Sequence, residues 1–244
     1  MINARKYVTL FVFVFLFGFA LNYVGVINPE HIQDPSIFDS RQATQLSKEG
    51  LQSHSLFIEN LGQLPDSIHY YSNLPEGMVA FTESKITFYI RETEINVTFL
   101  GSNKVHPQGE DFLSSYSNFF QGSQIFAWAR HCHKVVYHDL YEGVTLVYYF
   151  TSQGLKYDFI VDPYADINQI KMSYTGLEEI AVEPTKLIFT IEDIKLYDDE
   201  LQAWYESTKK PIDIQFKKQV ERNNEHDSEK DITICFVLEE SIDS

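Results

Sequence analysis

Apolar and polar residues alternate along much of the chain beyond residue 53, and the alternation is clearest over residues 155–161. One face of this segment carries Leu155, Tyr157, Phe159 and Val161. Lys156 and Asp158 fall on the opposite face. Because a strand places alternate side chains on opposite faces, this pattern predicts a β-strand. With the turn at Gln153 and Gly154 and the apolar run before it, residues 137–170 predict a β-hairpin.

Similar short segments recur about every ten residues, and turn-forming residues separate them. The pattern predicts strands at 54–58, 68–72, 78–82, 86–91, 94–100, 115–121, 126–136, 171–175, 180–182, 187–191, 195–197, 203–206, 212–220 and 231–238. A single helical turn is expected at 165–169. Many short strands and hardly a helix indicate an all-β fold, an antiparallel β-sandwich-like domain.

The N-terminal segment has a different pattern. Arg5 and Lys6 precede residues 7–27, which contain no charged residue. A helix of that length spans about 31 Å, close to the hydrocarbon thickness of a bilayer. We therefore expect an N-terminal transmembrane or signal helix, and favour an uncleaved signal anchor over a cleaved signal peptide.

The same analysis sets the expected boundaries and location. Residues 1–28 are the signal anchor or signal peptide, residues 29–50 a linker with two prolines, and residues 51–244 the β-domain. Because positive residues precede the apolar run, the positive-inside rule places the C-terminal domain outside the cell. The protein is then a single-pass membrane protein, or a secreted one if the leader is cleaved.

Composition narrows the functional classes. The chain carries 35 acidic and 19 basic residues, a formal net charge of −16. Such a surface repels phosphate backbones, so we expect no nucleic-acid partner. The motifs G-x-S-x-G, G-x-x-x-x-G-K-[ST] and G-x-G-x-x-G do not occur. We assign no catalytic residue and no cofactor.

Few residues offer other chemistry. His131, His133 and His138 form the only metal-like cluster in the sequence, and surface histidines are the better interpretation. Cys132 and Cys235 are either one disulfide or two separate thiols, and the sequence leaves both open.

Two further sets of side chains could contribute to surface recognition. Asn96 begins an Asn-Val-Thr glycosylation acceptor, and alternation places it opposite the apolar face of its strand. Trp128 and Trp204 are expected to fill the core rather than to form a sugar-stacking platform.

Five segments, in order, resemble a known family. They are FIENLGQ at 57–63, FFQG at 119–122, WAR at 128–130, DLYEGVTLVYY at 139–149 and LKYDFIVDPYAD at 155–166. Together they resemble a β-domain of unknown function found N-terminal to seven-bladed β-propeller (SBBP) repeats in secreted bacterial and archaeal surface proteins. The resemblance implies an extracellular β-sandwich-like module, and the family offers no catalytic residues.

The sequence departs from the family pattern at three positions. Glu142 stands where the family often has Pro, Thr145 where it often has Asp, and Tyr164 where it has Gly. We expect a non-catalytic extracellular domain for surface adhesion, structure or binding of a protein or glycan partner. The alternatives are a carbohydrate-binding module, which needs exposed coplanar aromatics, and a sandwich-fold hydrolase, which needs a cleft with convergent carboxylates.

Overall fold

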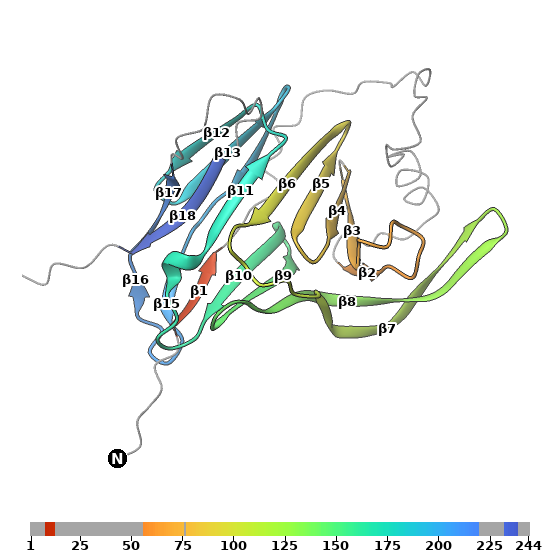
Figure 1. Cartoon of the computed structure of the whole chain (residues 1–244), viewed down its shortest axis with the longest axis horizontal. Helices are drawn as coiled ribbons and strands as arrows, with labels where there is room; N and C mark the ends of the chain where they lie inside the picture. Colours follow the sequence, from red (N-terminus) through yellow and green to blue (C-terminus); the bar gives the residue numbers. More distant parts are fainter. Residues whose placement is uncertain (1–7, 13–55, 76, 220–231, 239–244) are drawn as a thin grey trace, which may run out of the picture.

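The computed structural model describes residues 8–12, 56–75, 77–219 and 232–238 of the 244-residue chain. Within these residues the fold is all-β, as predicted, with a single 3-10 turn (Figure 1). The elements are β1 Val8–Val12, β2 Phe57–Glu59, β3 Tyr70–Leu74, β4 Gly77–Phe81, β5 Lys85–Ile90, β6 Thr93–Phe99, β7 Gln108–Gln121, β8 Gln124–Tyr141, β9 Val144–Thr151, β10 Gly154–Val161, η1 Ile167–Gln169, β11 Lys171–Thr175, β12 Glu179–Glu183, β13 Lys186–Ile191, β14 Ile194–Asp198, β15 Ala203–Tyr205, β16 Pro211–Ile212, β17 Ile214–Gln219 and β18 Ile232–Leu238.

The described strands form two antiparallel sheets. The larger has 15 strands, in the order β16-β15-β1-β10-β9-β8-β2-β3-β4-β5-β6-β11-β18-β17, and β7 pairs with β8 alone. The smaller has three strands, β12-β13-β14. Neighbours in sequence are mostly neighbours in the sheet, so short turns suffice to connect them.

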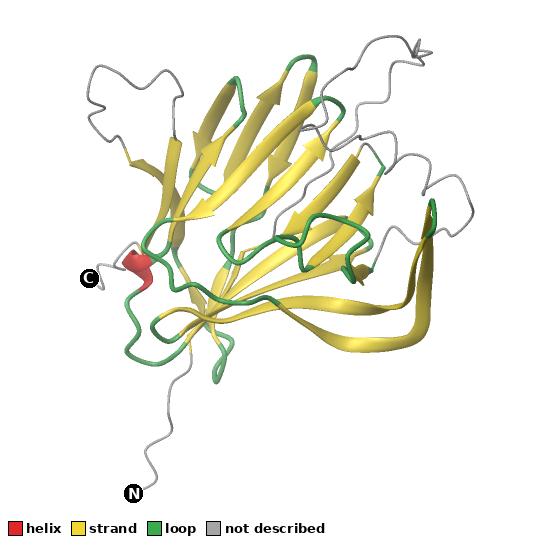
Figure 2. Cartoon of the chain, turned by 45° about the vertical axis from the view of Figure 1, so that its right-hand side comes forward, coloured by secondary structure: helices red, strands yellow, loops and turns green. Residues whose placement is uncertain are grey.

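The large sheet curves strongly, so that strands far apart in its order face one another across the core (Figure 2). Phe159 of β10 packs edge-on against Phe99 of β6, with ring centroids 6.5 Å apart, and against Phe236 of β18 at 5.8 Å. These contacts bury the apolar faces that the alternation predicted, and the burial of apolar area, aromatic and aliphatic together, drives folding.

The predicted hairpin is present as β9 and β10, which pair from Thr151 and Gly154 outwards. Its polar face is buried as well, because Lys156 is 1% exposed and Asp158 is 7% exposed. Burial raises the pKa of Asp158 to about 7, and Tyr149 donates a hydrogen bond of 3.1 Å to its carboxyl group. The alternation therefore identified the strand, although both of its faces are covered.

The segment before that hairpin contains a turn that the sequence analysis did not separate. Tyr141 pairs with Val144, so residues 142 and 143 connect β8 to β9. Gly143 takes φ +68°, a conformation that L-residues rarely adopt. A Cβ atom there would lie 3.0 Å from the Cβ of Ala165, so glycine also serves the close packing.

The expected helix over residues 7–27 is wrong for residues 8–12, which form strand β1. β1 pairs antiparallel with β10 on one side and with β15 on the other. Its sequence, Val-Thr-Leu-Phe-Val, is rich in β-branched and aromatic residues, which suit a strand as well as an apolar helix does. No helix in the described part of the chain is both long and apolar enough to cross a membrane. The rest of residues 1–28 and the linker at 29–50 lie outside the described residues.

Candidate functional site

The β7–β8 hairpin extends well beyond the body of the domain (Figure 1). We call its outer part, residues 112–130, the arm. Its two strands pair through Phe120 and Ile125 near the turn, and the register shifts twice, between Phe112 and Tyr116 and between Ser117 and Phe119. Such irregularities bend a two-stranded ribbon and redirect its side chains.

One side of the arm packs on the body. Phe119 and Ala129 are buried in a second hydrophobic cluster with residues of β2 to β4, among them Ile58, Tyr71 and Met78. The partly buried Phe126 packs against the same cluster. This cluster fixes the position of the arm relative to the sheet.

The other side of the arm is exposed and apolar. Five of the large exposed hydrophobic side chains in the described residues belong to it: Phe112, Tyr116, Phe120, Ile125 and Trp128. Three of them are far more exposed than is usual for such residues, with Phe120 at 72%, Ile125 at 65% and Trp128 at 63%. Two pairs of these residues are neighbours, Tyr116 with Trp128 by ring contact and Phe120 with Ile125 by strand pairing. Exposed apolar side chains that gather in this way mark interaction sites.

Trp128 is the most constrained residue of this patch, and the expectation that it fills the core is wrong. Its backbone has φ +70°, and its amide donates a 2.9 Å hydrogen bond to the side-chain oxygen of Asn118. Its ring lies 4.1 Å from that of Tyr116 at an angle of 47°. A bulky residue with positive φ is strained, and such strain is concentrated at functional positions.

The arm is anchored at its base by Arg130. The guanidinium donates to both carboxylate oxygens of Glu59, at 2.8 and 2.6 Å, and lies 4.2 Å from the centre of the Phe112 ring. The hydrogen bond from Arg130 holds the pKa of Glu59 below its ordinary value, against the opposing effect of burial. Glu59 and Arg130 belong to two of the segments that carry the family resemblance.

The loop after Glu59 is organised by Asn60. Its side-chain nitrogen donates to the carbonyl groups of Leu64, Pro65 and Ile68, and its oxygen accepts from the amides of Gly62 and Leu64. Gln63, which is buried, closes the other side by donating to the carbonyl of Glu59. The segment at 57–63, which carries part of the family resemblance, therefore has a structural explanation: it forms a loop that contacts the arm, where Gln121 donates to the carbonyl of Gln63.

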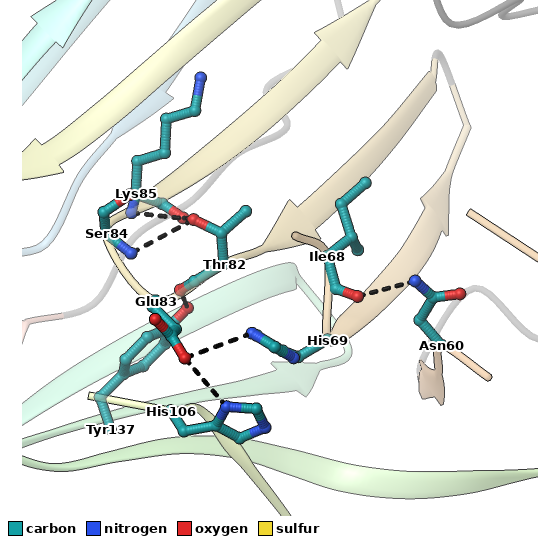
Figure 3. Close-up of polar contacts among 9 residues, drawn as sticks. All are labelled: Asn60, Ile68, His69, Thr82, Glu83, Ser84, Lys85, His106 and Tyr137. Carbon is teal, nitrogen blue, oxygen red and sulfur yellow. Dashed lines mark hydrogen bonds and ion pairs between the residues drawn. The ribbon is translucent and has the colours of Figure 1, made fainter. Parts of the chain in front are cut away.

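A second constellation lies where the arm leaves the body. His69, Glu83 and His106 come from the segment before β3, the β4–β5 turn and the segment before β7 (Figure 3). Nδ1 of His106 lies 3.2 Å from Oε1 of Glu83, and Nε2 of His69 lies 4.0 Å from the same oxygen. The two imidazole rings are 3.8 Å apart between centroids. Burial, followed by the nearby His106, lowers the pKa of His69.

The sequence model of a family described as a domain of unknown function, DUF7948, matches residues 57–243. The chain belongs to the DUF7948 family. No curated protein and no solved structure matches it. Strand β1 lies outside the residues that the DUF7948 model matches.

The DUF7948 domain separates the histidines that the sequence grouped. His131 is 4% exposed, and its two ring nitrogens are hydrogen-bonded to Ser115 at 2.9 Å and Ser117 at 2.8 Å. His133 is exposed, and His138 is paired with Glu110 at 3.0 Å. Among the described residues, the metal-like group of three side chains is His69, Glu83 and His106 instead.

The remaining predicted residues are placed as follows. Cys132 is buried in β8 and Cys235 lies in β18, and both are free thiols. Burial raises the pKa of Cys132 to about 12, so it is not a reactive thiolate. Asn96 is in β6, where its amide nitrogen donates to Glu94 and its oxygen accepts from Thr87. Its glycosylation stays a prediction.

The sequence does carry a signal that marks the arm. Residues 112–129 contain no Asp, Glu, Lys or Arg, although 22% of the whole chain is charged. No comparable signal marks His69, Glu83 and His106, because the three residues lie in separate segments. The pairing of β3, β4 and β5 relates His69 to Glu83, and the pairing of β7 with β8, beside β2, places His106.

Proposed function

We propose that this protein is an exported, non-catalytic binding domain with a sandwich-like fold, and that it holds a protein partner with the exposed face of the arm. The observation that carries the proposal is the exposed apolar side of the arm, formed by Phe120, Ile125 and Trp128 on an otherwise acidic chain.

The amino-acid composition of the arm favours a role in binding another protein. Residues 112–129 intersperse aromatic residues with Ser, Asn, Gln and Gly and contain no Asp, Glu, Lys or Arg. Interface centres are depleted of charge and enriched in aromatics. Antibody paratopes use the same mixture, with rigid aromatic anchors and small polar residues that adapt their hydrogen bonds.

The two-stranded architecture of the arm favours a state in which a partner protein covers its exposed side chains. Beyond the second hydrophobic cluster it is a ribbon of two strands, in which Phe120 pairs with Ile125. A two-stranded ribbon is at best marginally stable in water. Covering the exposed side chains of such a ribbon would bury apolar area at about 25 cal/mol per Å², so the arm gains stability when a partner binds.

A protein surface suits the arm better than a sugar ring does. The rings of Tyr116 and Trp128 are tilted by 47°, so they do not form one flat platform. A flat platform is what stacking against successive sugar rings requires. A protein surface can offer separate pockets for aromatic side chains that are tilted relative to one another.

The export part of the proposal rests on the sequence. Arg5 and Lys6 precede the uncharged run at 7–27, as in export signals, and β1 takes up only residues 8–12 of that run. Attachment at the cell surface and secretion are distinguished by fractionation of the source cells, with the mass of the chain measured in the membrane fraction and in the medium. Finding the intact chain in the cytosol alone would contradict export.

The binding proposal is tested with a photocrosslinking amino acid, benzoylphenylalanine. It replaces Phe120 on the arm or, as the matched control, Tyr164, a fully exposed aromatic elsewhere in the domain. Each full-length chain is applied to intact cells of the source organism and illuminated. We expect a crosslinked protein from position 120 and none from position 164.

Competition makes the test specific. An excess of the wild-type chain should remove the crosslink, whereas a Phe120→Ser, Ile125→Ser variant should not. The same product from both positions, or none from position 120, would refute binding through the arm. Retention on a glycan array that is lost with Trp128→Ala would favour the carbohydrate-binding alternative.

A further inference from the structure

Two imidazoles and one carboxylate converge at the base of the arm, from three segments distant in sequence (Figure 3). We propose that His69, Glu83 and His106 bind one divalent first-row transition-metal ion, with Zn²⁺ the expected occupant. This site is separate from the exposed face of the arm and goes beyond the proposed binding function.

The distances suit a single ion. The bonds from zinc to histidine nitrogen and carboxylate oxygen are about 2.0–2.2 Å, which places tetrahedral ligand atoms about 3.3 Å apart. Oε1 of Glu83 is 3.2 Å from His106 and 4.0 Å from His69, and the three ligand atoms lie within 4.8 Å of one another. Small side-chain rotations therefore bring all three onto one ion.

The kinds of donor atom indicate which class of metal ion the site would bind. Imidazole nitrogen suits Zn²⁺, Cu²⁺ and Ni²⁺, whereas Ca²⁺ and Mg²⁺ require oxygen ligands in larger number. Three protein ligands leave a fourth position for water, which the exposure of Glu83 and His106 permits.

The backbones of the first two ligands are held in place. His69 donates its amide to the carbonyl of Phe81 and accepts from the amide of Asn60, each at 2.9 Å. The turn that presents Glu83 is closed by the hydroxyl of Thr82, which accepts from the amides of Ser84 and Lys85. Such fixed ligands lose little conformational entropy when they bind a metal.

Deep packing supports the same turn. The hydroxyl of Tyr137, a fully buried side chain, donates a 2.8 Å hydrogen bond to the carbonyl of Thr82. His106 is followed by the buried Pro107 and then by β7, whose first residue pairs with Val136. All three ligands thus stand on backbone that the sheet positions.

The contact between His138 and Glu110 is an ordinary ion pair with which the proposed metal site can be compared. His138 and Glu110 lie 3.0 Å apart, as close as His106 and Glu83, and both are partly exposed. In the part of the chain that the structure describes, no third His, Cys, Asp or Glu joins that pair within the distance one metal ion would need. A histidine–carboxylate contact alone therefore does not define the site; the third ligand, His69, does.

A bound ion would join three parts of the fold. It would link the segment before β3, the β4–β5 turn and the segment that leads into β7. Because β7 is the first strand of the arm, the metal would fix the base from which the arm projects.

The test is isothermal titration of the purified full-length chain, first treated with EDTA, with Zn²⁺. We expect one ion per chain. His106→Gln, His69→Gln and Glu83→Gln should each weaken binding at least about tenfold, a loss typical of damaged metal sites. The matched control His138→Gln should bind as the wild type does, and Ca²⁺ should not compete.

A structural readout accompanies the titration. Hydrogen–deuterium exchange of residues 104–108 should slow when Zn²⁺ is added to the wild type and to His138→Gln, and should not change in His106→Gln. Circular dichroism checks that each variant is folded. Because the side chain of His106 is exposed, His106→Gln should fold as the wild type does.

Three results would overturn the metal site. They are the absence of zinc binding by the wild type, equal binding by His106→Gln, and equal loss in His138→Gln. The arm is tested separately, because Phe120→Ser should retain zinc binding whether or not it loses the protein partner.

Discussion

Removing the side chain of Asn60 tests whether the 57–63 segment is a structural loop. Its amide nitrogen donates to three carbonyls, at 3.1, 3.0 and 2.7 Å, and its oxygen accepts from two amides, at 3.1 and 3.0 Å. Asn60→Ala deletes all of these contacts. The loop beside the arm then lacks the side chain that links its backbone groups.

The expected loss can be worked from these contacts. The amide group has only two hydrogens, so its three donor contacts count as about two bonds, and the acceptor contacts add two more. At about 1 kcal/mol net each, and with water replacing part of the loss in a partly exposed loop, Asn60→Ala should lower the free energy of unfolding by about 2–3 kcal/mol.

Urea unfolding followed by fluorescence measures the loss. Asn103→Ala is the matched control, because Asn103 is exposed and its side chain makes one such bond, 2.8 Å to the carbonyl of Asp139. The control should cost about 1 kcal/mol or less. Equal losses in the two variants would refute the structural account of the segment.

The isosteric variant Asn60→Asp adds a pH signature. Its oxygen can still accept from the amides of Gly62 and Leu64, but the carboxylate faces carbonyl groups where the amide donated. Repulsion from these carbonyls raises the folded pKa of the new acid above its unfolded value of about 3.9. The variant should therefore be most stable below that value, relative to the wild type, and lose stability as the pH rises through the folded pKa.

Three further predictions follow from the same structure. Tyr164 is fully exposed and has φ +75°, a conformation that glycine adopts without strain, so Tyr164→Gly should raise the free energy of unfolding by up to about 1 kcal/mol in thermal unfolding; a loss would contradict the strain. Arg130→Gln should cost about 0.5–1 kcal/mol at neutral pH, because the Arg130 side chain is 55% exposed and water screens its contact with Glu59. The difference should vanish in acid, because the pKa of Glu59 is lowered in the folded state and the contribution of the pair is lost as the pH falls through that folded pKa; a pH-independent loss would exclude the ion pair. Leu10→Pro should lower the urea midpoint, because proline removes a backbone donor from β1 between β10 and β15; an unchanged midpoint would mean that β1 adds nothing to the domain.

The sequence predicted strands well where alternation reflects a single buried face. Residues 171–175 were predicted as a strand and are β11, and the predicted turn at 165–169 contains η1. Residues 86–91 and 94–100 match β5 and β6 closely, because their apolar faces lie against one core. Period-two patterns depend only on local geometry, so no knowledge of the partners is needed.

Prediction from the sequence failed where the surroundings of a residue come from distant parts of the chain. Apolar residues 8–12 fit a helix and a strand equally well, and only pairing with β10 and β15 decides between them. Trp128 was assigned to the core because tryptophan usually is buried, whereas the bent ribbon turns it outwards. The His69, Glu83 and His106 group depends on sheet order, which no spacing in the sequence encodes.

Fluorescence of Trp128 tests the central claim most directly. The chain has two tryptophans, so Trp204→Phe leaves Trp128 as the single reporter. In the free chain its emission should lie at long wavelength and be quenched readily by acrylamide, because 63% of the residue is exposed. Adding the cell-envelope fraction of the source organism should shift the emission to shorter wavelength and protect it from the quencher. Emission that is already shielded in the free chain, or that is unchanged by the envelope fraction, would contradict binding through the arm.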